Sequence, residues 1–217
     1  MYSFLKKRIP KKNNRGFTLI ELLVTIMIFV ILTGVVLFNQ NGFNNTVLIN
    51  NLAYDIALTV RQAQNYGTNV NESQSAINPF SSYGAYFNIS PSGGSPTNFV
   101  FFADTVGGIG GVPDGKYDGT PSNGSVTNCP ANDSECIQRY TIGSGNYIKS
   151  ICTVSSTNQS ICNSTLTILF KRPNPDALIY ADGNTTPLSS AQITVSSASG
   201  ITKTIVITAA GQIYVQK

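Results

Sequence analysis

The first long hydrophobic pattern in the chain is an apolar run over residues 17–38 that carries a single charge, Glu21. At about 1.5 Å per residue, a helix of about 22 residues spans the roughly 30 Å hydrocarbon core of a bilayer. A carboxylate about one turn inside such a run costs roughly 2–3 kcal/mol or more unless it finds a partner. The pattern therefore predicts a transmembrane helix over 17–38, with Glu21 as a candidate functional residue.

Beyond residue 38 the apolar positions recur every three or four residues, at Leu48, Leu52, Ile56, Val60 and Ala63. This spacing predicts an amphipathic continuation of the helix over 39–67 with one apolar stripe. The stripe is expected to pack against a sheet that follows in the chain; the alternative is a contact with a neighbouring subunit. Gly67 and the polar run 68–75 predict the end of the helix.

From residue 83 onwards the pattern changes to short β-branched and aromatic runs separated by Gly, Pro and Asn, which indicates strands joined by turns. The expected strands are 83–89, 99–103, 137–142, 147–154, 166–170, 178–180, 193–196, 203–208 and 212–215. The clearest hairpin is formed by the last two runs, around Ala209-Ala210-Gly211. The predicted fold class is α+β, with a long N-terminal helix packed on a mostly antiparallel β-sheet head over 68–217.

The net charge of +4 is concentrated before residue 16, where there are six basic residues and no acidic ones: Lys6, Lys7, Arg8, Lys11, Lys12 and Arg15. These residues are expected to hold the N-terminus in the cytoplasm and to direct everything after residue 38 outward. The remainder of the chain has eight basic and ten acidic residues, a net charge of −2. With scattered cations and no tryptophan, the head is not expected to bind nucleic acid.

An ordinary secretory signal or signal anchor is the simplest alternative for this N-terminus. The apolar run is, however, longer than the usual 7–15 residues of a signal core. The residues that follow it, Phe38-Asn39-Gln40-Asn41, are bulky and polar, and therefore unlike a small-x-small cleavage site. Both features argue against signal peptidase.

The residues Arg15-Gly16-Phe17-Thr18-Leu19-Ile20-Glu21-Leu22-Leu23-Val24 resemble the class III signal of type IV prepilins and pseudopilins. The resemblance implies that a prepilin peptidase cleaves between Gly16 and Phe17 and that the new amine of Phe17 is methylated. Glu21 would then be the fifth residue of the mature chain. In this family that residue pairs with the terminal amine of a neighbouring subunit, which would supply the cation that a buried carboxylate requires.

The same resemblance implies a domain organisation, a location and a set of partners. The expected segments are a basic leader at 1–16, the membrane helix at 17–38, its amphipathic continuation at 39–67 and the head at 68–217. The expected location is the inner membrane of a bacterium, in a single pass with the head outside the cytoplasm, and then a filament. The expected partners are prepilin peptidase, other pilin or pseudopilin subunits, the inner-membrane assembly platform and, before assembly, membrane lipid.

The head has a looser resemblance, carried by residues 83–87, 99–104 and 205–213, to the H-type minor pseudopilins of type II secretion and related minor pilins. A major pilin or another minor pilin is the alternative. The functional hypothesis is a structural subunit of a type IV pilus or of a type II secretion pseudopilus. A second hypothesis is a tip subunit that binds DNA or a surface, which predicts an exposed basic or aromatic patch on the head.

The four cysteines, Cys129, Cys136, Cys152 and Cys162, all lie in the part expected to be exported, where thiols oxidise. Three pairings are possible, and Cys129–Cys136 with Cys152–Cys162 is preferred because both bonds would close short, turn-rich loops. Free thiols and zinc are the alternatives. Zinc is disfavoured because the spacing is unusual and the chain has no histidine.

Three aspartates, Asp104, Asp114 and Asp118, fall in the glycine-rich segment 103–119, which could place oxygen ligands around a calcium ion. EF-hand spacing is absent. The alternative is that each aspartate forms hydrogen bonds with the backbone of its own turn, which is common for Asp among glycines.

No enzymatic activity is expected, and no cofactor other than the possible calcium. The chain has no histidine, no Gly-x-Ser-x-Gly nucleophile elbow and no phosphate loop. The glycine pairs at 107–108 and 110–111 do not follow the order of a dinucleotide-binding site and are interpreted as turn residues.

Overall fold

Helix α1 begins at Leu19, ends at Thr68 and is 50 residues long. The computed structural model describes residues 16–69, 81–105, 113–119, 128–130, 133–155, 157 and 159–216, without the side chains of 38–43. The chain divides into two units, Met1–Asn41 and Gly42–Lys217; we call the second the head unit. The amphipathic part of α1 therefore belongs to the head unit, because its apolar stripe is buried there.

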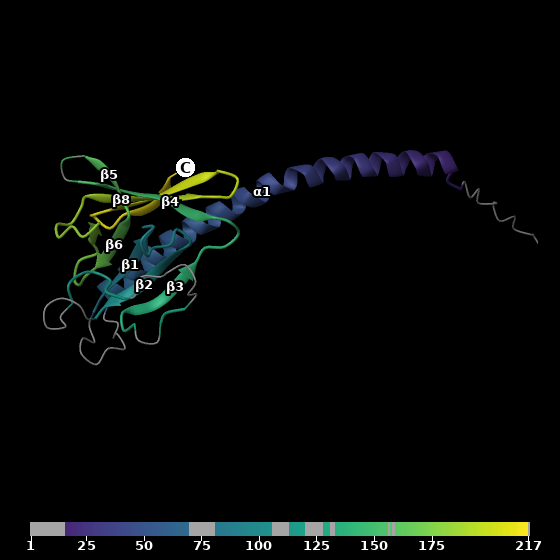
Figure 1. Cartoon of the computed structure of the whole chain (residues 1–217). Coiled ribbons are helices and arrows are strands. Elements are labelled where there is room, and N and C mark those ends of the chain that lie inside the picture. Colours follow the sequence, from purple (N-terminus) through teal and green to yellow (C-terminus); the bar gives the residue numbers. More distant parts are fainter. Residues whose placement is uncertain are drawn as a thin grey trace, which may run out of the picture. The chain divides into compact units, whose positions relative to one another are not determined.

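The N-terminal segment of α1, Leu19–Leu37, is long and apolar enough to cross a membrane, and none of it is buried within the chain. Among the described residues, ten strands follow α1 and form two five-stranded sheets, and every strand pair is antiparallel (Figure 1). The expected α+β class is confirmed.

The first sheet has the strand order β3-β2-β1-β6-β7. Its strands are β1 (Ser82–Asn88), β2 (Asn98–Asp104), β3 (Cys136–Thr141), β6 (Thr165–Phe170) and β7 (Ala177–Ala181). The second sheet has the order β10-β9-β8-β4-β5. Its strands are β4 (Tyr147–Val154), β5 (Ser160–Asn163), β8 (Ser190–Ser196), β9 (Thr202–Thr208) and β10 (Ile213–Gln216).

Strand β5 was not predicted from the sequence. It is only four residues long and is mostly exposed, so it lacks the alternation of apolar and polar positions that marks a half-buried strand. It forms because it pairs with β4 at the edge of the second sheet. The division of the strands into two sheets was likewise not part of the sequence pattern.

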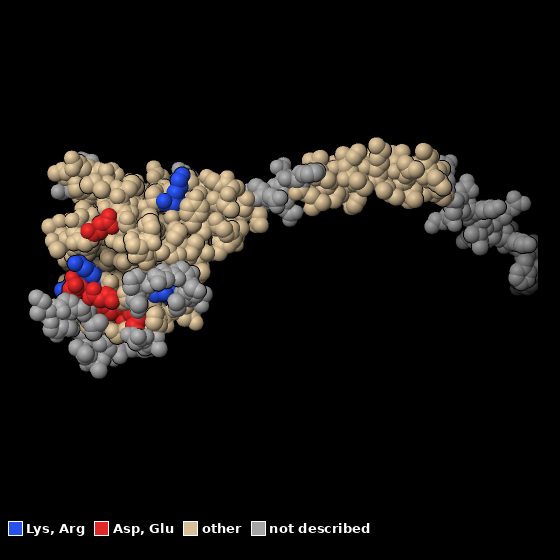
Figure 2. Space-filling view, viewed as in Figure 1, with Lys and Arg blue, Asp and Glu red and all other residues tan. Residues whose placement is uncertain are grey.

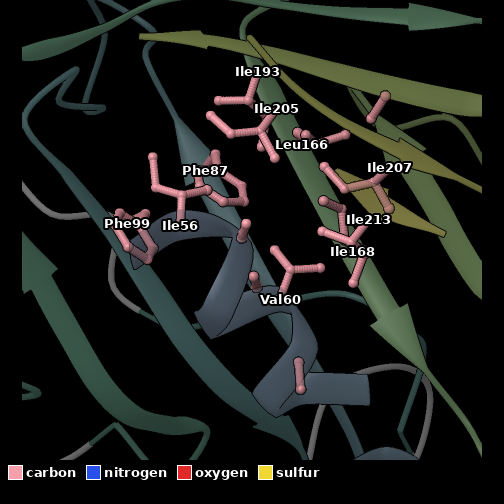
Figure 3. Close-up of a cluster of buried hydrophobic side chains, with 14 of the residues drawn as sticks. Ile56, Val60, Phe87, Phe99, Leu166, Ile168, Ile193, Ile205, Ile207 and Ile213 are labelled. Atoms are coloured by element: carbon pink, nitrogen blue, oxygen red, sulfur yellow. The ribbon is translucent and has the colours of Figure 1, made fainter. Parts of the chain in front are cut away.

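The apolar stripe of α1 packs against both sheets of the head unit. Ile56 and Val60 are fully buried, and they face Phe87, Leu166 and Ile168 of the first sheet and Ile193, Ile205, Ile207 and Ile213 of the second (Figure 3). The expectation that the stripe packs within its own chain is therefore confirmed. At the end of the helix, a Cβ on Gly67 would lie 2.5 Å from the carbonyl oxygen of Phe170, so only glycine allows this close approach to β6.

Candidate functional site

The first turn of α1 contains the residues that the sequence singles out. The Glu21 N–H donates a hydrogen bond to Thr18 Oγ1 at 3.3 Å, and the Thr18 hydroxyl donates to Glu21 Oε2 at 3.4 Å. This arrangement is close to a capping box, in which the residue before a helix and the third helical residue form reciprocal hydrogen bonds. The carboxylate also interacts favourably with the positive end of the helix dipole.

Around this turn, the residues that the structure describes supply no apolar cover. Phe17 is 76% exposed, and the large apolar side chains from Leu19 to Leu37 are exposed on all sides of the helix. A helix that is apolar all round is stable only when lipid or other helices surround it. The exposed apolar surface of residues 17–37 is thus of the kind that lipid or other helices cover.

The four cysteines form two disulfides, Cys129–Cys136 and Cys152–Cys162. Cys152 and Cys162 are directly opposite each other in the β4–β5 pairing, so this bond closes the hairpin at the sheet edge. The other bond links the first residue of β3 to the loop before it. The pairing is the one that the short loops favoured.

The three aspartates proposed for calcium have different environments. Asp104, at the end of β2, is 2% exposed, and its Oδ2 accepts a hydrogen bond from Gly115 N at 3.1 Å. Burial raises the pKa of Asp104 to about 6; the Gly115 N–H opposes this shift, and the charges of Asp114 and Asp118 add to it.

Asp114 and Asp118 form other hydrogen bonds in the same loop. Asp114 Oδ1 accepts a hydrogen bond from Lys116 N at 3.0 Å, which is the local turn described by the alternative interpretation. Asp118 is exposed, and its N–H donates to Glu135 Oε2 at 2.7 Å. Among the residues that the structure describes, no three acidic, cysteine or histidine side chains are grouped to hold a metal ion. The structure therefore gives the calcium hypothesis no support.

Two residues that the sequence did not single out hold the loop 113–119 in place. Glu135 is 1% exposed and accepts hydrogen bonds from the N–H groups of Thr105 and Asp118. Tyr117 is buried, and its hydroxyl donates to Asp133. Burial, together with the Asp133 carboxylate, raises the pKa of Tyr117, so its hydroxyl stays protonated. These contacts join distant segments, and no local pattern indicates them.

Comparison with known protein families places the N-terminus in a defined class. The family model described as the prokaryotic N-terminal methylation motif matches residues 11–37. The chain thus carries the class III signal of type IV prepilins and pseudopilins. This motif implies processing by prepilin peptidase and assembly with other pilins. No curated protein and no solved structure matches the chain.

The match ends at residue 37, so it does not include the head unit. The likeness of the head to H-type minor pseudopilins stays a prediction. The class shown is therefore that of a pilin-like subunit, defined by its signal and its apolar helix.

Proposed function

We propose that this protein is a structural subunit of a type IV pilus or a type II secretion pseudopilus, stored in the inner membrane and assembled into a filament. The observation that carries the proposal is the methylation motif placed on the Leu19–Leu37 segment of α1, whose large apolar side chains are exposed in the part of the chain that the structure describes. The strand pattern of the head, at residues 83–87, 99–104 and 205–213, favours a minor subunit similar to the H-type pseudopilins and related minor pilins. The basic leader would keep the N-terminus in the cytoplasm and the head outside.

The proposed cleavage lies between Gly16 and Phe17. A Cβ on Gly16 would meet no atom of the described residues within 4 Å, so the described part of the fold does not require glycine here. A requirement for glycine would then come from the peptidase. Cleavage leaves Phe17, two residues before α1, as the new N-terminus and as the proposed site of methylation.

Assembly would bury the apolar surface of residues 17–37 among the helices of other subunits, with the assembly platform extracting each subunit from lipid. Glu21 would guide docking because its carboxylate is costly in lipid and is stabilised beside the Phe17 ammonium of a neighbour. A second surface on α1 is available for subunit contacts. Val47, Tyr54 and Leu58 are 38%, 59% and 61% exposed and, at helical spacing, share one side of the helix.

The test separates the charge of Glu21 from its capping role. Glu21→Ala removes both, whereas Glu21→Gln keeps an oxygen that can accept from Thr18 but removes the charge. We expect both variants to be exported, cleaved and retained in the membrane, while incorporation into filaments falls at least about tenfold, equivalent to about 1.4 kcal/mol. Asp176→Ala, at an exposed acidic position just before β7 in the head unit, is the control and should assemble normally.

The measurement is the amount of this subunit in sheared filaments relative to the membrane fraction. Tracking the subunit itself matters because a tip subunit that enters first has no neighbour ahead of it. Normal incorporation of Glu21→Ala would show that Glu21 does not direct assembly. Normal incorporation of Glu21→Gln alone would assign the effect to helix capping and would contradict the ion-pair mechanism.

A further inference from the structure

One row of side chains crosses the first sheet on the face opposite the core. In the strand registers, Arg139 lies opposite Val100, Val100 opposite Tyr86, Tyr86 opposite Thr167, and Thr167 opposite Tyr180. Residues directly opposite in neighbouring strands point to the same face. The adjacent residues in these strands, such as Phe87 and Ile168, are in the core on the other face. On the outer face, Thr167 thus has one tyrosine on each side, Tyr86 and Tyr180.

A third tyrosine from the loop 113–119 forms a wall above this row. A Cβ at Gly84 would lie 2.7 Å from the Phe102 ring, so glycine allows Phe102 to lie over the strand backbone. The ring of Tyr117 packs on Phe102 and on Tyr86, with centroids 5.3 Å and 5.0 Å apart. Its hydroxyl is held by Asp133. Packing and hydrogen bonding therefore fix Tyr117 in place.

Beside this wall lies an open cavity of about 160 Å³. The three tyrosines Tyr86, Tyr117 and Tyr180 line it, together with Thr165, Thr167 and a polar rim that includes Lys116, Asp118, Asp182 and Asn184. Asp182 is used by the fold, since it accepts hydrogen bonds from Ser164 N and Thr165 N at 2.9 Å and 2.8 Å. Pockets that bind drug-sized ligands have volumes of about 300–1,000 Å³, so this smaller cavity has room for a single small ring.

The chemistry of the lining is aromatic and hydrogen bonding, with charges of both signs at the rim. Burial raises the pKa of Tyr86, Tyr117 and Tyr180, so their hydroxyls are neutral at pH 7. Lys116 and Asp118 place a donor and an acceptor at the same rim. Among the described residues in Figure 2, most side chains are neither acidic nor basic, and the charged ones that this view shows lie on the head unit. These features suit a neutral ligand that has both apolar C–H groups and hydroxyls.

We propose that this cavity binds one neutral hexopyranose unit of a carbohydrate. A pyranose presents C–H groups on its ring face, which pack on tyrosine rings, and hydroxyls at its edge, which match carboxylate, amide and ammonium groups. The row Tyr86–Thr167–Tyr180 forms the floor and Tyr117 the wall. All lining residues of the cavity belong to the head unit, so sugar binding does not depend on filament assembly.

The test uses the full chain in a polyoxyethylene detergent, which carries no sugar headgroup. Saturation-transfer difference NMR is recorded with the methyl pyranosides of glucose, galactose, mannose and N-acetylglucosamine. Open-chain sorbitol and tetramethylammonium are the comparison ligands. We expect transfer to the ring C–H groups of at least one pyranoside, with a dissociation constant of about 1–10 mM, and none to sorbitol.

Two variants and a control link the signal to the cavity. Tyr180→Ala should weaken binding at least about tenfold, and Asn184→Ala, at an exposed rim position, about threefold to tenfold. Tyr214→Ala removes a tyrosine that is 50% exposed on β10 of the other sheet and should bind as the unchanged protein does. If circular dichroism shows that Tyr180→Ala does not fold, the effect of Asn184→Ala on binding tests whether the sugar occupies the cavity.

Three outcomes would overturn the proposal. The first is no transfer to any of the four pyranosides. The second is pyranoside binding that a folded Tyr180→Ala, or failing that Asn184→Ala, leaves unchanged. The third is binding of tetramethylammonium in place of the pyranosides, which would identify the tyrosines as a cation-binding site.

Discussion

Arg61 of α1 donates a hydrogen bond from Nη2 to the backbone carbonyl of Ile213 on β10, at 2.8 Å. One helical turn later, Gln64 Nε2 donates to the carbonyls of Pro175 and Gly211, at 2.9 Å and 3.0 Å. Strand β10 is an edge strand with one neighbour, β9. The two helix side chains therefore hold β10 and the turn before it against α1.

Replacement of Arg61 by Ala should destabilise the head unit by about 1 kcal/mol, because a charge-assisted hydrogen bond to a partly exposed carbonyl is lost. Urea unfolding of the full chain, followed by circular dichroism, measures the change. Lys149→Ala, an exposed basic position on β4, is the control and should change stability by less than about 0.5 kcal/mol. Equal stability of the two variants would show that the Arg61–Ile213 bond contributes nothing.

The mature protein should begin at Phe17. Prepilin peptidase acts at the cytoplasmic face and can reach the Gly16–Phe17 bond while the helix remains in the membrane. Mass spectrometry of the intact protein from the native host should find the N-terminal residue as methylated phenylalanine. A mature N-terminus near residue 40 would indicate signal peptidase and would contradict the filament-subunit proposal.

The purified protein should contain no free thiol. Alkylation without reductant should leave Cys129, Cys136, Cys152 and Cys162 unlabelled, and peptide mapping should recover the two pairs present in the structure. Replacing both Cys152 and Cys162 by Ser should lower the stability by about 2–3 kcal/mol, since this cross-link closes a short loop in the unfolded chain. Four labelled thiols in the unreduced protein would refute the pairing.

The stability of the head unit should depend on the titration of Asp104. Its pKa is raised from 3.8 to about 6, so the folded state favours the protonated form. The resulting contribution to stability is complete below about pH 3.8 and is lost as the pH rises through about 6. Asp104→Asn should therefore flatten the decline of the melting temperature between pH 4 and pH 7, relative to the unchanged protein.

Asp176→Asn provides the control for this experiment, because Asp176 is exposed. Its profile of melting temperature against pH should run parallel to that of the unchanged protein. A parallel profile for Asp104→Asn as well would mean that Asp104 titrates normally in the folded state.

The N-terminal part of the protein could be predicted from the sequence because its physics is local. A run of apolar residues long enough for a bilayer, a basic stretch before it and one carboxylate inside it depend on no other part of the chain. The stripe through Ile56 and Val60 was equally visible, since helical spacing alone places these residues on one side. The short cysteine spacings favoured the observed disulfides for the same reason.

The tertiary structure alone decided which strands share a sheet, and with them the outer face of the first sheet. Tyr86 is far in sequence from Thr167 and Tyr180, and it meets them only through the registers of β1, β6 and β7. The burial of Tyr117 likewise depends on its loop packing on Tyr86 of β1 and Phe102 of β2, and that of Glu135 on contacts with the distant Thr105 and Asp118. The short strand β5 depends on its pairing with β4. Hydrophobic periodicity identifies which face of a strand is buried, but strand order and register depend on contacts between distant segments.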